Sequence, residues 1–228
     1  LATGRPIENP QADYSKTAKA ELVYPGPLGG HNWNPVSWNP GTGLLYFSEL
    51  QMPSVFKADN AVGFKENGRR YNMALDMAGM MDDPAFLAEL RNPRGSLIAW
   101  DVANARIAWQ VPQPLPTNGG TLSTAGNLVF HGTADGRLVA YAADSGKQLW
   151  EGRTFGGVQA GPVSYAVDGR QYIATGIGWG GGHGAAMPDD LTVLGPTGAY
   201  AATISAFLRV VLDNPTRWRL ILTMPESM

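Results

Sequence analysis

Residues 95–101 read GSLIAWD and lead on to Trp109, while residues 136–141 read GRLVAY and lead on to Trp150. Gly, Leu, Ala and Trp each recur at the same spacing, 41 positions apart (136 − 95). Each copy has the pattern of an apolar strand, a polar turn and a second strand that ends on a large ring. One such unit cannot bury both of its faces, so the pattern predicts units that stack side by side.

A second element repeats in phase with the first. Residues 161–165, GPVSY, follow residues 120–124, GTLST, at the same spacing, and residues 34–38, NPVSW, echo them. Each copy is followed by a turn and an apolar strand, and the turns lie at 40–43, 125–127 and 167–170. Turn residues between short β-rich runs are typical of hairpins. Four strands per unit predict an all-β fold, a β-propeller with a partial set of blades. The alternative is a sandwich with evenly spaced strands.

Composition narrows the classes of function. The chain has 228 residues, 29 of them glycine, a net charge of −2 and no cysteine. There is no basic stripe, which argues against a nucleic-acid partner, and no apolar run of about 18 residues, which argues against a transmembrane helix. Without cysteine there is neither a thiolate metal site nor a cysteine nucleophile. The first residues lack the basic start and apolar core of a signal peptide, and without an initiator methionine we expect a processed chain or a fragment.

Outside the repeat the pattern changes. We expect an extended lead-in over 1–30, an insertion between blades over 57–94, a glycine-rich loop over 176–198 and an atypical tail over 199–228. Within the insertion, Asp82 and Asp83 can cap a short helix that starts at Pro84. In the tail, apolar residues at helical spacing between Ile204 and Leu212 predict a helix, and 219–224 predict a last strand.

The second copy of the repeat, AYAADSGKQLW over 140–150, resembles the tryptophan-docking motif of quinoprotein alcohol dehydrogenases. Ala140, Gly146 and Trp150 match that motif, whereas the first copy has Ala105 where glycine is usual. Members of the family fold as an eight-bladed propeller whose motif tryptophans pack between blades. The resemblance therefore implies a structural role for Trp109 and Trp150.

Three loops extend the resemblance over about residues 29–182, in family order. Residues 29–35, GGHNWNP, are similar to the loop whose asparagine and following residue face pyrroloquinoline quinone. Residues 118–130, NGGTLSTAGNLVF, resemble the family's Trp-Asn-Gly-Gly-Thr stretch, with Thr117 where many members have tryptophan. Residues 178–181, GWGG, resemble a loop beside the quinone. The cofactor-binding residues implied in this way are Asn32, Trp33, Trp179 and Gly180.

Each of these residues also has a plainer interpretation. Asn32 can be a turn-forming asparagine, Trp33 a core aromatic, and the loop around Trp179 a tight turn. The three histidines, His31, His131 and His183, lack the spacing of a zinc site. We expect His131, at the end of an apolar strand, to be a buried residue with its hydrogen bonds satisfied.

The resemblance also implies what lies outside the chain. The family's catalytic aspartate and calcium ligands come earlier, so this chain corresponds to the C-terminal portion, without a catalytic or metal-binding residue, and alone is expected to be inactive. With an N-terminal propeller half, the complete protein would oxidise a small alcohol to an aldehyde with pyrroloquinoline quinone and calcium, and pass electrons to cytochrome c in the periplasm. The alternative is a non-enzymatic propeller scaffold of the outer-membrane assembly type.

Overall fold

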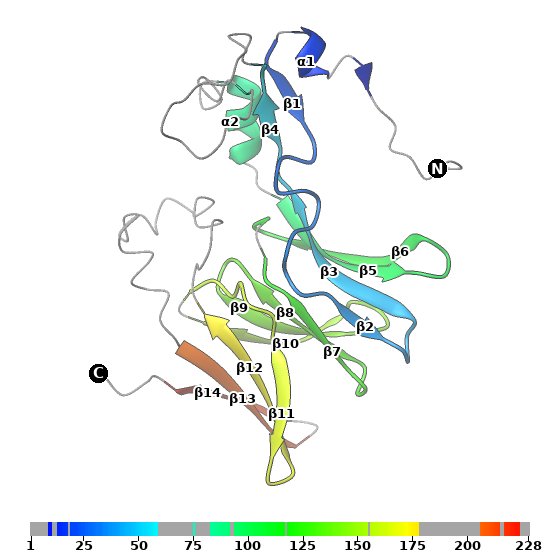
Figure 1. The fold of residues 1–228 in the computed structure, drawn as a ribbon. Coiled ribbons are helices and arrows are strands. Elements are labelled where there is room, and N and C mark those ends of the chain that lie inside the picture. Colours follow the sequence, from blue (N-terminus) through cyan, green and yellow to red (C-terminus); the bar gives the residue numbers. More distant parts are fainter. Residues whose placement is uncertain are drawn as a thin grey trace, which may run out of the picture. The chain divides into compact units, whose positions relative to one another are not determined.

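The computed structural model describes residues 9–10, 13–17, 19–58, 75, 83–91, 94–116, 118–154, 156–177, 206–214 and 217–223. The chain divides into two compact units. Unit 1 comprises residues 1–30 and 51–93, and unit 2 comprises residues 31–50 and 94–228. Figure 1 shows the elements of both units, which are described separately below.

The described part of unit 1 contains two short helices and a two-stranded sheet. They are α1 (Tyr14–Thr17), β1 (Glu21–Val23), β4 (Ser54–Phe56) and α2 (Pro84–Leu90), with β1 antiparallel to β4. The predicted capping of α2 is confirmed, because the Asp83 carboxylate accepts hydrogen bonds from the backbone N–H groups of Ala85 and Phe86. Pro84 takes the first helical position, where its missing N–H costs nothing. The expected lead-in over 1–30 is not simply extended, since it contains α1 and β1.

The described residues of unit 2 form three antiparallel sheets of four strands each (Figure 1). The first sheet consists of β2 (Ser37–Asn39), β3 (Leu44–Gln51), β5 (Arg94–Asp101) and β6 (Arg106–Gln113). The second sheet consists of β7 (Thr121–Thr124), β8 (Leu128–Thr133), β9 (Arg137–Ala142) and β10 (Gln148–Arg153). The third sheet consists of β11 (Val163–Val167), β12 (Arg170–Ile177), β13 (Ala206–Asn214) and β14 (Arg217–Thr223). The repeat predicts four strands per blade, as found in each of these sheets.

The repeated residues have equivalent places in the first two sheets. Ala99 pairs with Trp109 across β5 and β6, and Ala140 pairs with Trp150 across β9 and β10. Each hairpin also has a register shift beside this pair. The small residue lies opposite the large ring in both copies, which explains why alanine and tryptophan recur together.

The three predicted turns join the first two strands of each sheet. They connect β2 to β3, β7 to β8 and β11 to β12. Asp168 and Gly169 both have positive φ angles, 51° and 74°. A two-residue turn with positive φ at both positions matches the twist of the strands that it joins.

The core lies on both faces of the second sheet. Successive side chains of a strand point to opposite faces, and those of β8 and β9 enter two separate clusters. One cluster, with Ile173 and Ile177 of the third sheet, takes Phe130, Leu138 and Ala140. The other, with Tyr46 and Leu97 of the first sheet, takes Val129, Val139 and Tyr141. The second sheet is therefore buried by its neighbours on both sides, as the stacking argument predicts.

The two repeat tryptophans both contribute to packing. The Trp109 indole N–H donates to the Ala143 carbonyl at 3.0 Å, and its ring lies 5.6 Å from that of Tyr46. A Cβ atom added to Gly146 would lie 2.7 Å from a ring carbon of Trp109. Trp150 packs against the cluster that contains Phe130. Trp109 of the first sheet thus covers a turn of the second.

Two expectations differ from the structure. Residues 52–93 connect β3 to β5, which are neighbours in the first sheet, so the segment interrupts one sheet rather than linking two. In the tail, the predicted helix is wrong, because residues 206–214 form β13, which pairs with β12 and β14. Spacing alone does not separate a helix from a strand in a short apolar run, and the adjacent Val210 and Val211 favour a strand. The predicted last strand is present as β14.

Candidate functional site

The loops that precede β2, β7 and β11 meet in unit 2. The Pro35 carbonyl accepts a hydrogen bond from the Thr121 backbone N–H at 2.9 Å. A Cβ atom on Gly120 would lie 2.7 Å from Cδ of Pro35 and 2.9 Å from Cα of Gly161. Only glycine allows so close an approach. The three sheets are therefore brought together at the start of their first strands, where the preceding loops end.

Buried amides join two of these loops. The Asn34 side chain donates to the Asn118 carbonyl at 3.1 Å. The Asn118 side chain donates to the Leu115 carbonyl at 2.7 Å and accepts from the Ala134 N–H at 3.0 Å. These groups are neutral, so the loops are held without charge. Amides are suited to this because each one both donates and accepts.

Asn32 and Trp33 lie in the loop before β2. Oδ1 of Asn32 accepts a hydrogen bond from the Trp33 backbone N–H at 2.8 Å. Trp33 is 55% exposed in this chain and belongs to neither of the two clusters of buried residues. The Asn32 bond is local and is compatible with a turn-forming asparagine, and the cofactor role of both residues stays a prediction.

The other two predicted cofactor residues, Trp179 and Gly180, lie outside the described residues, as do Thr117 and His183. β12 ends just before them, at Ile177. The Thr175 hydroxyl donates to the Ala160 carbonyl at 3.2 Å. This end of β12 therefore lies beside the loop that precedes β11.

A serine on β3 connects two histidines and one of these loops. The Ser48 hydroxyl, on β3, contacts Nε2 of His131 at 2.8 Å and also donates to the Gly119 carbonyl. The Ser48 carbonyl accepts from Nδ1 of His31 at 2.8 Å. Sequence reasoning missed Ser48, since it lies 83 positions from His131 and no motif connects the two.

His131 is fully buried on β8. Burial lowers its pKa to about 3, the nearby charge of Arg137 acts in the same direction, and Asp135 opposes them. Its ring is therefore neutral near pH 7. Nδ1 of His131 has no hydrogen-bond partner within the part of the chain that the structure describes. The expectation of a buried histidine is confirmed, but its hydrogen bonds are not all satisfied.

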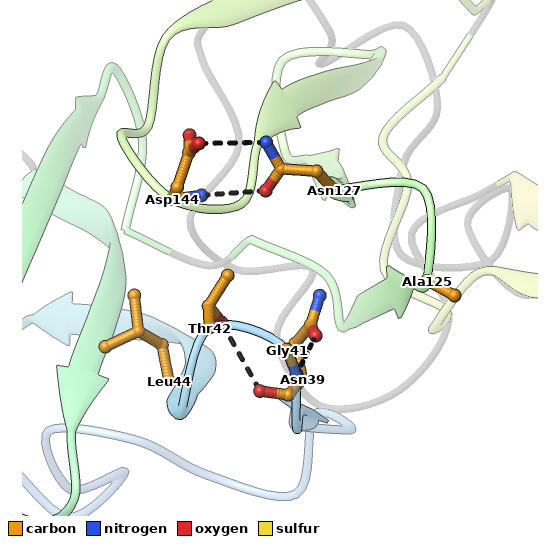
Figure 2. A pocket seen from close by; sticks show the side chains of 7 residues that line it. All are labelled: Asn39, Gly41, Thr42, Leu44, Ala125, Asn127 and Asp144. Atoms are coloured by element: carbon orange, nitrogen blue, oxygen red, sulfur yellow. Dashed lines mark hydrogen bonds between the residues drawn. The ribbon is translucent and has the colours of Figure 1, made fainter.

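A separate pocket of about 420 Å³ lies between turns of the first and second sheets (Figure 2). It is lined by Asn39, Gly41, Thr42, Leu44, Ala125, Asn127 and Asp144. Asn127 and Asp144 form two hydrogen bonds with each other, at 3.0 and 3.2 Å. Asn39 accepts from the Gly41 N–H at 2.9 Å and donates to the Thr124 carbonyl at 3.1 Å. These bonds stabilise the turns, and no predicted site residue lies in this pocket.

No group of three or more histidine and acidic side chains gathers in the described ranges. None of the helices described there has the length and apolar character needed to cross a membrane.

The stacked four-stranded sheets and their converging loops define a segment of a quinoprotein-type propeller. A family model described as "PQQ: Glucose/ethanol/alcohol dehydrogenase, beta-propeller domain" matches residues 6–173. The chain belongs to this family.

Individual relatives agree with this assignment. Quinohemoprotein alcohol dehydrogenase ADH IIB of Pseudomonas putida is 43% identical over 79% of this chain and 25% of its own length. The 1-butanol dehydrogenase (cytochrome c) of Thauera butanivorans is 41% identical over 79% of this chain and 26% of its own length. The solved structure of quinohemoprotein alcohol dehydrogenase ADHIIG from Pseudomonas putida HK5 superposes with a TM-score of 0.70 at 42% identity, over 78% of this chain and 27% of that one. The chain thus spans about a quarter of the length of the relatives that it matches.

Proposed function

We propose that this chain is the C-terminal portion of an alcohol dehydrogenase that depends on pyrroloquinoline quinone, and that Asn32, Trp33, Trp179 and Gly180 contact the quinone. The observation that carries the proposal is the convergence of the loops that precede β2, β7 and β11, the first of which contains Asn32 and the exposed Trp33. The relatives named above are alcohol dehydrogenases, which favours an enzyme over a scaffold.

The donors at these loops fit such a cofactor. Pyrroloquinoline quinone is flat and carries carboxylates and carbonyl oxygens, so an amide such as that of Asn32 can donate to it without adding charge. Trp33, the next residue, is exposed, so its indole offers a flat apolar surface to a ligand. Glycines at 119, 120 and 161 leave no side chain in the way where the loops meet. The residues of this chain bind and orient the cofactor and exclude water from one side of it.

The remaining parts of the reaction lie in the complete protein. The bound quinone supplies the oxidising power for converting an alcohol to an aldehyde. Calcium, held by residues upstream of this chain, would polarise the quinone, and an upstream aspartate would act as base. Electrons would pass to a cytochrome c, as the name of the butanol-oxidising relative suggests, and the location would be the periplasm. This chain by itself is then inactive.

The test uses the full-length protein that carries this chain. We expect it to bind pyrroloquinoline quinone in a titration and to reduce an acceptor dye with alcohols. Asn32→Ala should weaken quinone binding about tenfold, the value of one well-placed hydrogen bond. The matched control is Asn104→Ala, in the turn between β5 and β6, which should leave quinone affinity unchanged.

Two results would contradict the proposal. A full-length protein that neither binds the quinone nor reduces the dye would overturn the enzymatic function. Unchanged quinone affinity in Asn32→Ala would overturn the assignment of Asn32 as a cofactor contact.

A further inference from the structure

We propose that Ser48 and His131 are positioning residues that hold two of the loops predicted to face the cofactor, and so set the affinity for the quinone. This inference rests on the proposed function. Ser48 contacts both loops directly, through its carbonyl to His31 and through its hydroxyl to Gly119. His131 acts through Ser48.

The hydrogen bonds fix where each proton lies. The Gly119 carbonyl can only accept, so the single hydroxyl proton of Ser48 is directed to it. The Ser48 oxygen must then accept from His131, which places the proton of that ring on Nε2. The Ser48 carbonyl likewise requires a proton on Nδ1 of His31. Ser48 thereby fixes the tautomer of His131, with the proton on Nε2, and requires a proton on Nδ1 of His31.

These contacts lie next to the residues that would touch the cofactor. His31 precedes Asn32 directly, and its ring packs edge-on against Phe47, with centroids 5.5 Å apart. Gly119 lies between Asn118 and Gly120 and also donates to the Gly132 carbonyl at 2.9 Å. A Cβ atom on Gly119 would lie 2.2 Å from the Val158 carbonyl oxygen, so this loop has no room to shift inward. Ser48 thus joins both the loop that contains Gly119 and the loop that contains His31 to β3.

The unsatisfied atom of His131 supports a role beyond packing. Nδ1 is fully buried without a partner in the described residues, and such atoms are costly in protein cores. An apolar residue would fill the position on β8 without that cost. The charged groups that act on the ring are Arg137 and Asp135, and burial keeps it neutral. Core packing alone therefore does not account for a histidine at this buried position, whereas the hydrogen bond from Nε2 to Ser48 does.

The test compares variants that keep or remove this bond in the full-length protein. His131→Gln keeps an N–H donor near the place of Nε2, whereas His131→Leu removes it. Ser48→Thr keeps the hydroxyl, whereas Ser48→Ala removes it. Val139→Ala is the control, because Val139 is buried opposite His131 on β9 and has no bond to Ser48.

Two quantities are measured for each variant, the dissociation constant of pyrroloquinoline quinone by titration of the apoprotein, and the midpoint of thermal unfolding. We expect Ser48→Ala and His131→Leu to raise the dissociation constant about tenfold. His131→Gln and Ser48→Thr should stay within about twofold of the wild type. Val139→Ala should lower the midpoint of unfolding without changing the dissociation constant.

The inference is overturned if His131→Gln and His131→Leu bind the quinone equally well, or if Val139→Ala weakens binding as much as Ser48→Ala. A wild-type protein that binds no quinone overturns the proposed function, and this inference with it. Wild-type binding that is unchanged in Ser48→Ala and His131→Leu overturns this inference alone.

Discussion

The first and second sheets are built from the same repeat but are buried to different extents. In the second sheet, β8 and β9 are buried at every position after their first residue. In the first sheet, β5 is buried over five consecutive residues like its counterpart β9, but β3, the counterpart of β8, alternates between buried and half-buried residues. The second sheet has a neighbour on each face, contributed by the first and third sheets. The difference between β3 and β8 therefore follows the place of each sheet in the stack, because β8 has a neighbouring sheet on each face.

The two copies also differ at one turn position. Ala105 and Gly146, which are 41 positions apart, both have positive φ angles, 50° and 71°. Gly146 is buried under the ring of Trp109, whereas Ala105 is exposed. The backbone conformation disfavours any side chain at both positions, but a ring excludes one only at Gly146. Glycine is therefore favoured at both positions by the backbone conformation, but at Gly146 it is also required by the lack of space.

The largest expected effect comes from placing a side chain at the covered position. Gly146→Ala should lower the free energy of unfolding by about 3 kcal/mol, because it adds backbone strain and a clash with Trp109. Gly126→Ala is the matched control, since its Cβ would have only a Thr124 hydroxyl nearby, at 3.8 Å.

A double-mutant cycle separates the two terms at Gly146. In a Trp109→Ala background the clash is absent, so Gly146→Ala should cost only about 1–2 kcal/mol, the strain alone. The measurement is denaturant unfolding of the four proteins. Equal costs in both backgrounds would show that the ring does not restrict this turn.

The pH dependence of stability reports on the burial of the second sheet. The pKa of His131 is about 3 in the folded protein, whereas the ordinary value for histidine is 6.5. Below about pH 6.5 the unfolded chain binds a proton that the folded chain does not, so stability falls as the pH falls toward 3. Between pH 7 and 5 this amounts to about 2 kcal/mol.

The pH effect is measured as the difference between wild type and His131→Gln, which has no titrating group at this position. Arg137 and Asp135, the charged groups near the ring, are present in both proteins. Wild type should lose more stability than His131→Gln between pH 7 and 5. Parallel pH profiles would mean that the second sheet does not shield this ring from water.

The repeat, the hairpin turns and the cap of α2 could be predicted from the sequence because each depends on residues close together in the chain. Asp83 bonds to the second and third residues after it, and Ala99 faces Trp109 within one hairpin. The tail strand β13 could not, because its partner β12 lies across a long connection. Ser48 and His131 are also distant in the chain, and only the stacking of two sheets brings them together. Local spacing does not report contacts between sheets.

The smallest expected effect completes the comparison of the two turns. Ala105→Gly relieves the strain of a positive φ angle, which stabilises the folded protein by about 1–2 kcal/mol. It also gives the unfolded chain more conformational freedom, which lowers the free energy of unfolding by about 0.4–1 kcal/mol. The net expectation is a gain in stability of about 0.5–1 kcal/mol, measured as a raised midpoint of thermal unfolding. Because Ala105 is exposed, no ring or neighbouring sheet should alter this result. A loss of stability would show that the methyl group of Ala105 makes a contact worth more than the strain, and that the two copies of the repeat satisfy the same turn in different ways.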